Sequence, residues 1–296
     1  MSSKIYFKEK SQRRLSWYLI RIITSSMKLL PKKQRNRMVA NLLLKPVRAT
    51  KDVPIKISQD FLQTPYGRVA IYCVGDGPIV LMSHGWSGSA SQLFGLMRDI
   101  AAQGYRAIAI DHIGHGASAG KLANLFLFVR TLEFVIQHLE KNEKITALVA
   151  HSMGAPAILS AIKRTYPTLL IAPVFEFAKS LFSKVEESGL PRSLLLDMLD
   201  DLEARYGLNL SQCDPKKHIV KHASDTYIIH DHDDVYSPIE DSVSLAEKHE
   251  QIVLRKTRNL GHGRIISSDE TMQLFEEMMR EWNEVDICSE ARVVQG

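Results

Sequence analysis

Three segments of the chain carry the residue types that nucleophilic catalysis needs: a serine at Ser152, a histidine at His262, and carboxylates within 231–234. A serine hydroxyl is a weak nucleophile until an imidazole accepts its proton, and the imidazole needs a carboxylate to fix its tautomer. The three types occur along the chain in the order serine, acid, histidine, which one class of serine motif requires. The sequence therefore predicts acyl transfer through a serine.

The serine lies in the pentapeptide Ala150–Gly154 (AHSMG), between the apolar run ITALVA and a helical pattern. This pentapeptide matches the G-x-S-x-G motif of a tight strand–turn–helix elbow, except that Ala150 replaces the first glycine. Alanine is nearly as small, so we interpret it as a tolerated variant. We predict Ser152 as the nucleophile, with His151 and Gly154 as supporting residues.

A second candidate segment, His84-Gly85-Trp86, follows the apolar run IVLMS. An oxyanion hole needs two backbone N–H groups, and a neighbouring glycine keeps the chain close to the substrate. We expect the N–H groups of Trp86 and Met153 to supply it, with His84 and Gly85 in support. The alternative is a simple loop with a buried histidine, which we would favour if the serine motif were absent.

The elements that position these residues are short apolar runs alternating with helical patterns. Apolar runs at 69–74, 79–83, 107–110, 145–150, 169–172, 227–230 and 252–254 predict strands, and 122–141 predicts a helix. Uninterrupted apolar strands separated by helices indicate a sheet that is covered on both faces. The fold prediction is therefore α/β, a mostly parallel sheet of about eight strands with antiparallel strands near 55–62 and 69–72 at its edge.

These motifs together resemble serine hydrolases of the α/β-hydrolase fold, of the esterase, lipase and thioesterase type. The resemblance covers about residues 55–285 and rests on SHGW (83–86), DHIGHGAS (111–118), AHSMG (150–154), IHDHDDVYSP (229–238) and GHGRII (261–266). It implies a catalytic triad of Ser152, an acid and His262. It also implies that His112 and His115 belong to a structural loop rather than to a metal site.

The resemblance also suggests which acid completes the triad. Members of the family often carry H-G-x-x-D-x-x-V-P, and this spacing places the acid at Asp234. The chain departs from the pattern at Asp231 and Ser237, where the family usually has Gly and Val. Asp231 and Asp233 therefore stay open as alternatives, as does Glu176, at a position that a minority of the fold uses.

Charge divides the chain into two parts. Residues 1–51 hold eight Lys and six Arg against Glu9, a net charge of +13, and the remaining residues carry −8. Within this arm, 15–30 has an amphipathic helical pattern, and a second short helix is expected at 34–44. The segment lacks a secretory cleavage site and is too short and charged to span a membrane. Either the apolar face packs on the body, the interpretation we favour, or the arm makes peripheral contact with an anionic membrane.

We therefore expect an arm at 1–51 and a hydrolase domain at 52–296, with a small helical cap inserted at about 175–222. The composition, 45% hydrophobic and 24% charged, excludes a disordered chain. Three widely spaced cysteines predict neither a disulfide framework nor a zinc site, and favour a reducing, cytoplasmic location. No nucleic-acid motif accompanies the basic arm.

The predicted activity is cleavage of a small-molecule carboxylic ester or thioester, with no metal or organic cofactor. Two alternatives use the same fold: a ligand-binding protein with little turnover, and an acyltransferase with the same triad. The sequence leaves the acyl chain length and the oligomeric state open.

Overall fold

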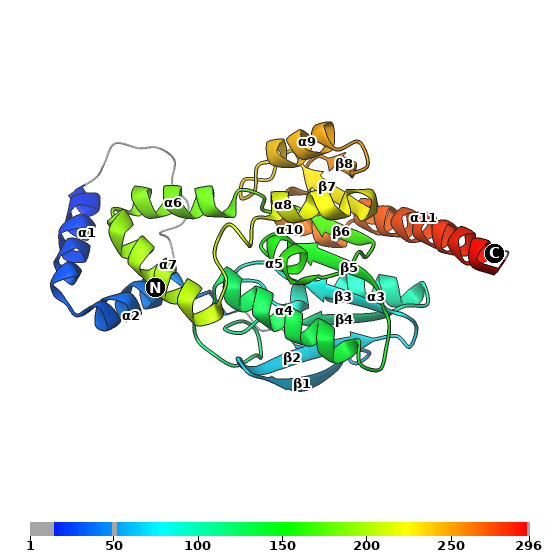
Figure 1. Cartoon of the computed structure of the whole chain (residues 1–296), viewed down its shortest axis with the longest axis horizontal. Helices are drawn as coiled ribbons and strands as arrows, with labels where there is room; N and C mark the ends of the chain where they lie inside the picture. Colours follow the sequence, from blue (N-terminus) through cyan, green and yellow to red (C-terminus); the bar gives the residue numbers. More distant parts are fainter. Residues whose placement is uncertain (1–14, 49–51, 295–296) are drawn as a thin grey trace.

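The computed structural model describes residues 15–48 and 52–294, and is built around one eight-stranded sheet (Figure 1). The strands are β1 (Ser58–Thr64), β2 (Gly67–Val74), β3 (Ile79–Ser83), β4 (Arg106–Ile110), β5 (Ile145–His151), β6 (Thr168–Ile171), β7 (Thr226–Asp231) and β8 (Val253–Thr257). Their order across the sheet is β1-β2-β4-β3-β5-β6-β7-β8. The pairs β1–β2 and β2–β4 are antiparallel and all other pairs are parallel. The predicted α/β-hydrolase fold is confirmed.

The central strands are apolar throughout because both faces of the sheet are covered. Successive side chains of a strand point to opposite faces, and in β3 Leu81 enters one core while Val80 and Met82 enter the other. All five residues of β3 are buried. This explains why the strands are uninterrupted apolar runs in the sequence rather than alternating ones.

Helices form the two outer layers. The remaining elements of the body are α3 (Phe94–Ala102) and α11 (Asp269–Val294) on one face, α4 (Leu125–Leu139), α5 (Gly154–Ala161), α8 (Pro215–Ile219) and α9 (Ile239–Lys248) on the other, and the short α10 (Gly261–Arg264). The long α4 begins at Asn124, whose side-chain oxygen accepts a hydrogen bond from the Leu127 N–H at 2.9 Å.

Two predicted strand limits are wrong, for local reasons. The strand expected at 169–172 is β6, which ends at Ile171 because Ala172 has a φ of 45°, outside the extended region. The edge strand expected at 55–62 begins only at Ser58, since a turn that joins the Ile57 N–H to the Pro54 carbonyl (2.8 Å) precedes it.

The segment between β6 and β7 forms α6 (Phe177–Ser188), α7 (Arg192–Tyr206) and α8, in the region where the sequence predicted a cap. The arm helices α1 (Leu15–Ser26) and α2 (Lys32–Leu43) lie beside α6 and α7 at the same end of the molecule (Figure 1). Arg35 forms an ion pair with Asp197 of α7 at 2.6 Å, and Asn36 Nδ2 donates to the Asp197 carbonyl at 2.9 Å. The arm therefore packs on the cap through α2.

The connector that follows α2 joins the arm to loops of the body. The Leu44 carbonyl accepts a hydrogen bond from the Ala123 N–H at 2.8 Å, and the Val47 N–H donates to Ser87 Oγ at 3.0 Å. The Arg48 guanidinium donates to the Ser118 carbonyl. The arm also contributes buried Met27, Val39 and Leu44 to the larger hydrophobic core.

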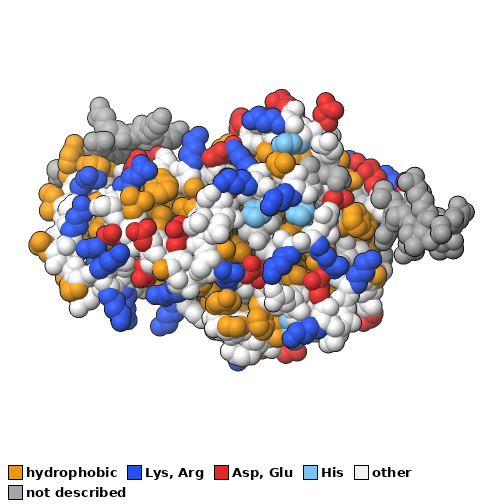
Figure 2. All heavy atoms as spheres, in the orientation of Figure 1, with side chains coloured by type: hydrophobic (Ala, Val, Ile, Leu, Met, Phe, Trp, Pro, Cys, Tyr) orange, Lys and Arg blue, Asp and Glu red, His pale blue; other side chains and the backbone are white. Residues whose placement is uncertain are grey.

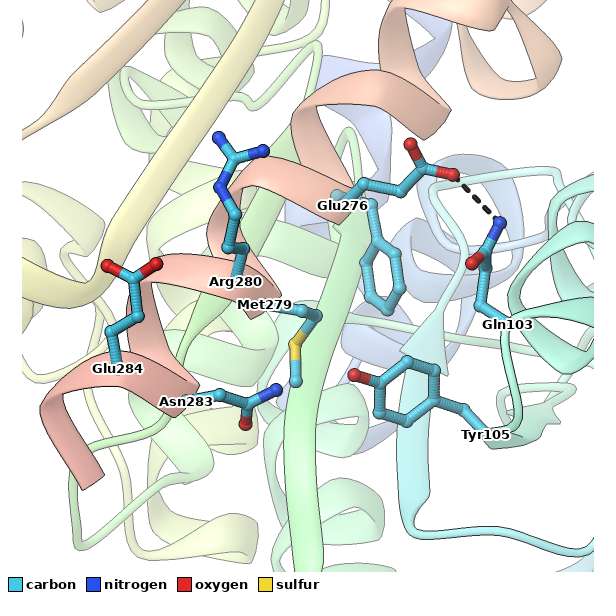
Figure 3. Close-up of a pocket in the computed structure, with 8 residues that line it drawn as sticks. Gln103, Tyr105, Glu276, Met279, Arg280, Asn283 and Glu284 are labelled. Carbon is cyan, nitrogen blue, oxygen red and sulfur yellow. Dashed lines mark hydrogen bonds between the residues drawn. The ribbon is translucent and has the colours of Figure 1, made fainter. Parts of the chain in front are cut away.

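A hollow lies at the other end of the molecule, between α11 and the residues that precede β4 (Figure 3). In Figure 3, Tyr105 faces Met279 across this hollow, and Gln103 Nε2 donates to Glu276 Oε1 at 2.9 Å. The hollow lies at the amino end of β4. In an open α/β sheet, ligands bind at the opposite, carboxyl ends of the strands.

Candidate active site

Ser152 lies at a sharp turn between β5 and α5. Its φ of 53° is in the left-handed region, which a non-glycine residue adopts only under strain. Gly154 permits this turn, because a Cβ at that position would lie 2.6 Å from the Ser83 carbonyl oxygen. Ala150 is fully buried in β5. The small residues around the serine thus let the helix begin directly against β3.

Three side chains from different loops form one hydrogen-bonded chain at the carboxyl edge of the sheet. Ser152 Oγ lies 3.0 Å from His262 Nε2, and His262 Nδ1 lies 2.7 Å from Asp234 Oδ2. Asp234 follows β7, and His262 belongs to α10 after β8. The structure therefore brings together the serine, histidine and first-choice acid of the sequence prediction.

Asp234 is held as a carboxylate. Its Oδ1 accepts hydrogen bonds from the backbone N–H groups of Tyr236 (2.8 Å) and Ser237 (3.0 Å). Burial by itself raises the pKa of Asp234, but hydrogen bonds from His230 and His262 and the charge of His262 outweigh it and hold the pKa well below its ordinary value. The residue facing His262 is therefore ionised at neutral pH.

His230 lies behind Asp234 and extends the chain of hydrogen bonds. It is fully buried, and its Nε2 lies 3.2 Å from Asp234 Oδ2 and 2.9 Å from the Ser237 carbonyl. Its Nδ1 faces Ser242 Oγ of α9 at 2.7 Å. Since only an N–H can approach two acceptors in this way, His230 donates from Nε2 and fixes the orientation of the acid.

The other candidate acids have different partners. Asp231 Oδ2 accepts from Thr257 Oγ1 at 2.7 Å and from the Leu260 N–H at 3.1 Å, which ties β7 to the loop after β8. Asp233 Oδ2 accepts from the Asn259 N–H at 2.7 Å. Glu176 forms an ion pair with Lys216. None of these three contacts the His262 imidazole, so the geometry favours Asp234.

The backbone N–H groups of Trp86 and Met153, which the sequence predicts as an oxyanion hole, are available to a ligand. Within 15–48 and 52–294, no hydrogen bond uses the N–H of either residue. Met153 also precedes the first turn of α5, where helix amides carry a partial positive charge. Gly85 lies against the serine, since a Cβ there would be 2.6 Å from Ser152 Cβ. One unpaired donor therefore follows Ser152 directly, and the other follows the glycine that packs against Ser152.

Histidines of two loops support this backbone. His84 is fully buried, and its Nδ1 donates to the Gly85 carbonyl at 2.7 Å while its Nε2 accepts from the His112 N–H at 3.1 Å. The His112 ring stacks on Phe128 with 3.6 Å between ring centroids, and His115 Nε2 accepts from the Ser87 N–H at 3.0 Å. Burial lowers the pKa of all three histidines, so this support is uncharged.

Asp111 begins the turn that carries two of these histidines. Its carboxylate accepts hydrogen bonds from the N–H groups of Ala90 and Ala117, both at 2.7 Å, and from the Tyr72 hydroxyl at 2.9 Å. The turn therefore has the structural role that the resemblance to α/β hydrolases implied. No group of three or more His, Cys, Asp or Glu side chains in the described ranges is arranged to hold a metal ion.

A match to a family model shows the protein family to which the chain belongs. The model described as serine aminopeptidase, S33, matches residues 77–235, more than half of the chain. The chain belongs to this family of α/β hydrolases. The matched range includes Ser152 and Asp234, and it ends before His262.

Solved structures show the same fold in distant relatives of this α/β hydrolase. The esterase Pf2001 of Pyrococcus furiosus superposes with a TM-score of 0.60 at 17% identity, covering 80% of this chain and 99% of the esterase. Est1E of Butyrivibrio proteoclasticus, solved with ferulic acid bound, gives a TM-score of 0.58 at 16% identity, covering 77% of this chain and 99% of Est1E. No curated protein matches the sequence. At these identities the likeness concerns the fold.

His151 has a contact in the hydrolase that its sequence position did not indicate. Its Nε2 donates to the backbone carbonyl of His262 at 2.9 Å, and the two rings lie 4.7 Å apart. Burial, with the neighbouring His262 charge, lowers the pKa of His151 to about 3. His151 is thus a neutral side chain that holds the loop of His262.

The buried neutral histidines make the stability of the hydrolase depend on pH. His84, His112, His115 and His151 have pKa values below the ordinary value, about 3 for His115 and His151. Below pH 6.5 the unfolded chain therefore binds protons that the native state does not, so the free energy of unfolding falls as pH falls. Each histidine should lower the free energy of unfolding by up to about 1.4 kcal/mol for each pH unit below 6.5.

Urea unfolding at about pH 7.5 and about pH 5 measures this dependence. The midpoint should fall between the two pH values at a constant m-value. In His151→Gln the free energy of unfolding should depend less steeply on pH, because one of the four buried histidines no longer contributes. A wild-type stability that does not change between these pH values would contradict the assignment of neutral buried histidines.

Proposed function

We propose that the chain is a serine hydrolase that cleaves a carboxylic ester or thioester through an acyl-enzyme on Ser152. The observation that carries this proposal is the continuous hydrogen-bonded chain from Ser152 through His262 to Asp234, with distances of 3.0 and 2.7 Å. Membership of the S33 family supports hydrolysis, and the esterases of the same fold favour an ester over a peptide.

In the first step Ser152 Oγ forms a bond to the substrate carbonyl carbon, and its proton passes to His262 Nε2. The imidazolium that results donates from Nδ1 to the Asp234 carboxylate, which stabilises its positive charge. The carbonyl oxygen becomes an oxyanion and accepts hydrogen bonds from the N–H groups of Trp86 and Met153.

In the second step the bond to the leaving group breaks, and the leaving alkoxide or thiolate takes the proton from His262 Nε2. The acyl group then remains as an ester of Ser152. A water molecule attacks this ester while His262 accepts the water proton, and the acid product leaves as the proton returns to Ser152 Oγ. Every one of these proton transfers passes through His262 Nε2.

A fluorophosphonate probe and a p-nitrophenyl ester series test the proposal. The wild type should form one phosphonyl adduct with loss of fluoride, located at Ser152 by peptide mass spectrometry, and should hydrolyse at least one ester. Ser152→Ala should lose the adduct and at least ~10³-fold of the activity. Ser160→Ala is the matched control, because Ser160 lies on α5 and its hydroxyl bonds to the Pro156 carbonyl and to Cys213, away from the triad.

The other outcomes separate the alternatives. An adduct on another residue, or activity that persists in Ser152→Ala, would contradict the proposal. A folded wild type that reacts with neither probe nor ester would favour a ligand-binding protein. Product that appears as a new ester when an alcohol is added would instead indicate acyl transfer.

A further inference from the structure

The outer face of α1 is apolar and lies open to solvent. Tyr18, Leu19, Ile22 and Ile23 are 51%, 54%, 67% and 63% exposed. At about 100° per residue these four positions share an arc of about 140° on the helix. We call them the α1 outer face.

The opposite side of α1 faces the cap. Thr24 is buried there, and Trp17 Nε1 donates to the Glu186 carbonyl of α6 at 3.3 Å. Met27, which follows α1, is also buried. The expectation that the apolar face packs on the body is therefore wrong for Leu19, Ile22 and Ile23, whereas Met27 does pack against the core. α1 is attached through its other side, and its most apolar side points away from the molecule.

Basic side chains lie beside this apolar face and just after it in the chain. Arg21 on α1 is exposed, as are Lys28, Lys32 and Lys33 just after it, and the sequence has no acidic residue between 15 and 48. Figure 2 shows hydrophobic and basic side chains intermixed at this end of the molecule. The arm thus combines an apolar strip with positive charge, and the acidic side chains near it, such as Glu186 and Asp197, belong to α6 and α7.

We propose that the α1 outer face docks on an anionic lipid membrane, with its apolar side chains among the acyl chains and its lysines at the headgroups. An exposed apolar helix face bordered by Lys and Arg has the chemistry that binds a bilayer interface. A second copy of this chain is less suitable, because a two-fold contact would oppose the same positive charges. Nucleic acid would leave the apolar strip unused.

The length of α1 fixes the mode of contact. Its 12 described residues extend about 18 Å, against about 30 Å for the hydrocarbon core, and Arg21 lies in the middle of them, so we expect α1 to lie in the interface rather than to cross it. Among the helices described, none has the length and hydropathy of a membrane span. Because Trp17 of α1 donates to the Glu186 carbonyl, α6 lies next to the docked helix. This inference does not depend on the acyl chemistry of the site.

Sedimentation with lipid vesicles tests the proposal on the full chain. Vesicles of phosphatidylcholine alone are compared with vesicles that also contain about 30% phosphatidylglycerol, at about 50 mM and about 500 mM salt. We expect binding to the anionic vesicles at low salt, and at least ~10-fold weaker binding at high salt or without the anionic lipid.

Two variants separate the apolar and the electrostatic contributions. Ile22→Gln/Ile23→Gln should weaken binding at least ~10-fold, since two side chains lose their burial in lipid. Lys28→Gln/Lys32→Gln/Lys33→Gln should weaken it ~100-fold, at about fivefold for each lysine. The matched control for the isoleucine variant is Ile55→Gln, at an exposed isoleucine before β1. The matched control for the lysine variant is Lys141→Gln/Lys163→Gln/Lys248→Gln, which removes the same charge from exposed positions on the body. Neither control should change binding by more than about twofold.

Three results would overturn the proposal. The first is no binding to anionic vesicles at low salt. The second is binding that the isoleucine variant leaves unchanged, which would indicate a general attraction to polyanions. The third is a wild-type dimer in sedimentation velocity that Ile22→Gln/Ile23→Gln converts to a monomer, which would make the outer face an interface between copies. Circular dichroism of each variant establishes that it is folded.

Discussion

Asp234→Asn is expected to lower kcat by about 10⁴-fold while the protein stays folded. The amide can present an N–H to His262 Nδ1, which reverses the tautomer and leaves Nε2 unable to accept the Ser152 proton. It also removes the negative charge that stabilises the imidazolium at 2.7 Å. Steady-state kinetics on the best ester, with thermal unfolding as a check of the fold, measure the effect.

The three other acids supply matched controls for this result. Asp233→Asn and Glu176→Gln should keep kcat within about tenfold, because their carboxylates bond to the Asn259 N–H and to Lys216. Asp231→Asn should mainly lower stability, since its carboxylate ties Thr257 and Leu260 to β7. A loss in any of these three that equals the loss in Asp234→Asn would assign the acid elsewhere.

Gly85→Ala is expected to lower kcat by about 10²- to 10³-fold, although it adds only one methyl group. The new Cβ would lie 2.6 Å from Ser152 Cβ and 3.1 Å from its Oγ, so the loop or the serine must move. A shift of that size displaces the Trp86 N–H from the position where the oxyanion forms. The kinetics of the soluble ester, compared with the thermal midpoint, separate loss of catalysis from loss of fold.

Gly263→Ala is the matched control, because a Cβ at that position meets no atom within 4 Å. This glycine lies in α10 directly after His262, so the control also tests whether any change near the histidine is harmful. We expect kcat within about threefold of wild type. Equal activity of Gly85→Ala and Gly263→Ala would mean that the Gly85 loop does not shape the site.

The strands and the positions of the candidate catalytic residues could be predicted because they depend on the local sequence. Buried strands such as β3 and β5 are continuous apolar runs, and the polar residues directly after them mark the carboxyl edge of the sheet. Ser152, Asp234 and His262 all lie just beyond strand ends. Their order and spacing were therefore visible without knowledge of any long-range contact.

Contacts between distant segments could not be predicted in the same way. His230 and His151 are separate histidines in the sequence, and only the fold shows that one donates to Asp234 and the other to the His262 carbonyl. The amphipathic pattern of α1 gave its apolar arc, but not the direction in which it points. That direction depends on the contacts of α1 and α2 with α6 and α7, which lie more than 100 residues away.

The contacts of the arm mean that the chain cannot be divided after Arg48 into an anchor and a free catalyst. Met27, Val39 and Leu44 belong to the same core as β3 and α4, and the Val47 N–H bonds to Ser87, the residue after Trp86. Cutting the arm away would open this core to water and release the loop of Trp86, which we propose as an oxyanion donor, from one of its supports. A protease that severed it would therefore inactivate the protein rather than release it in a working form.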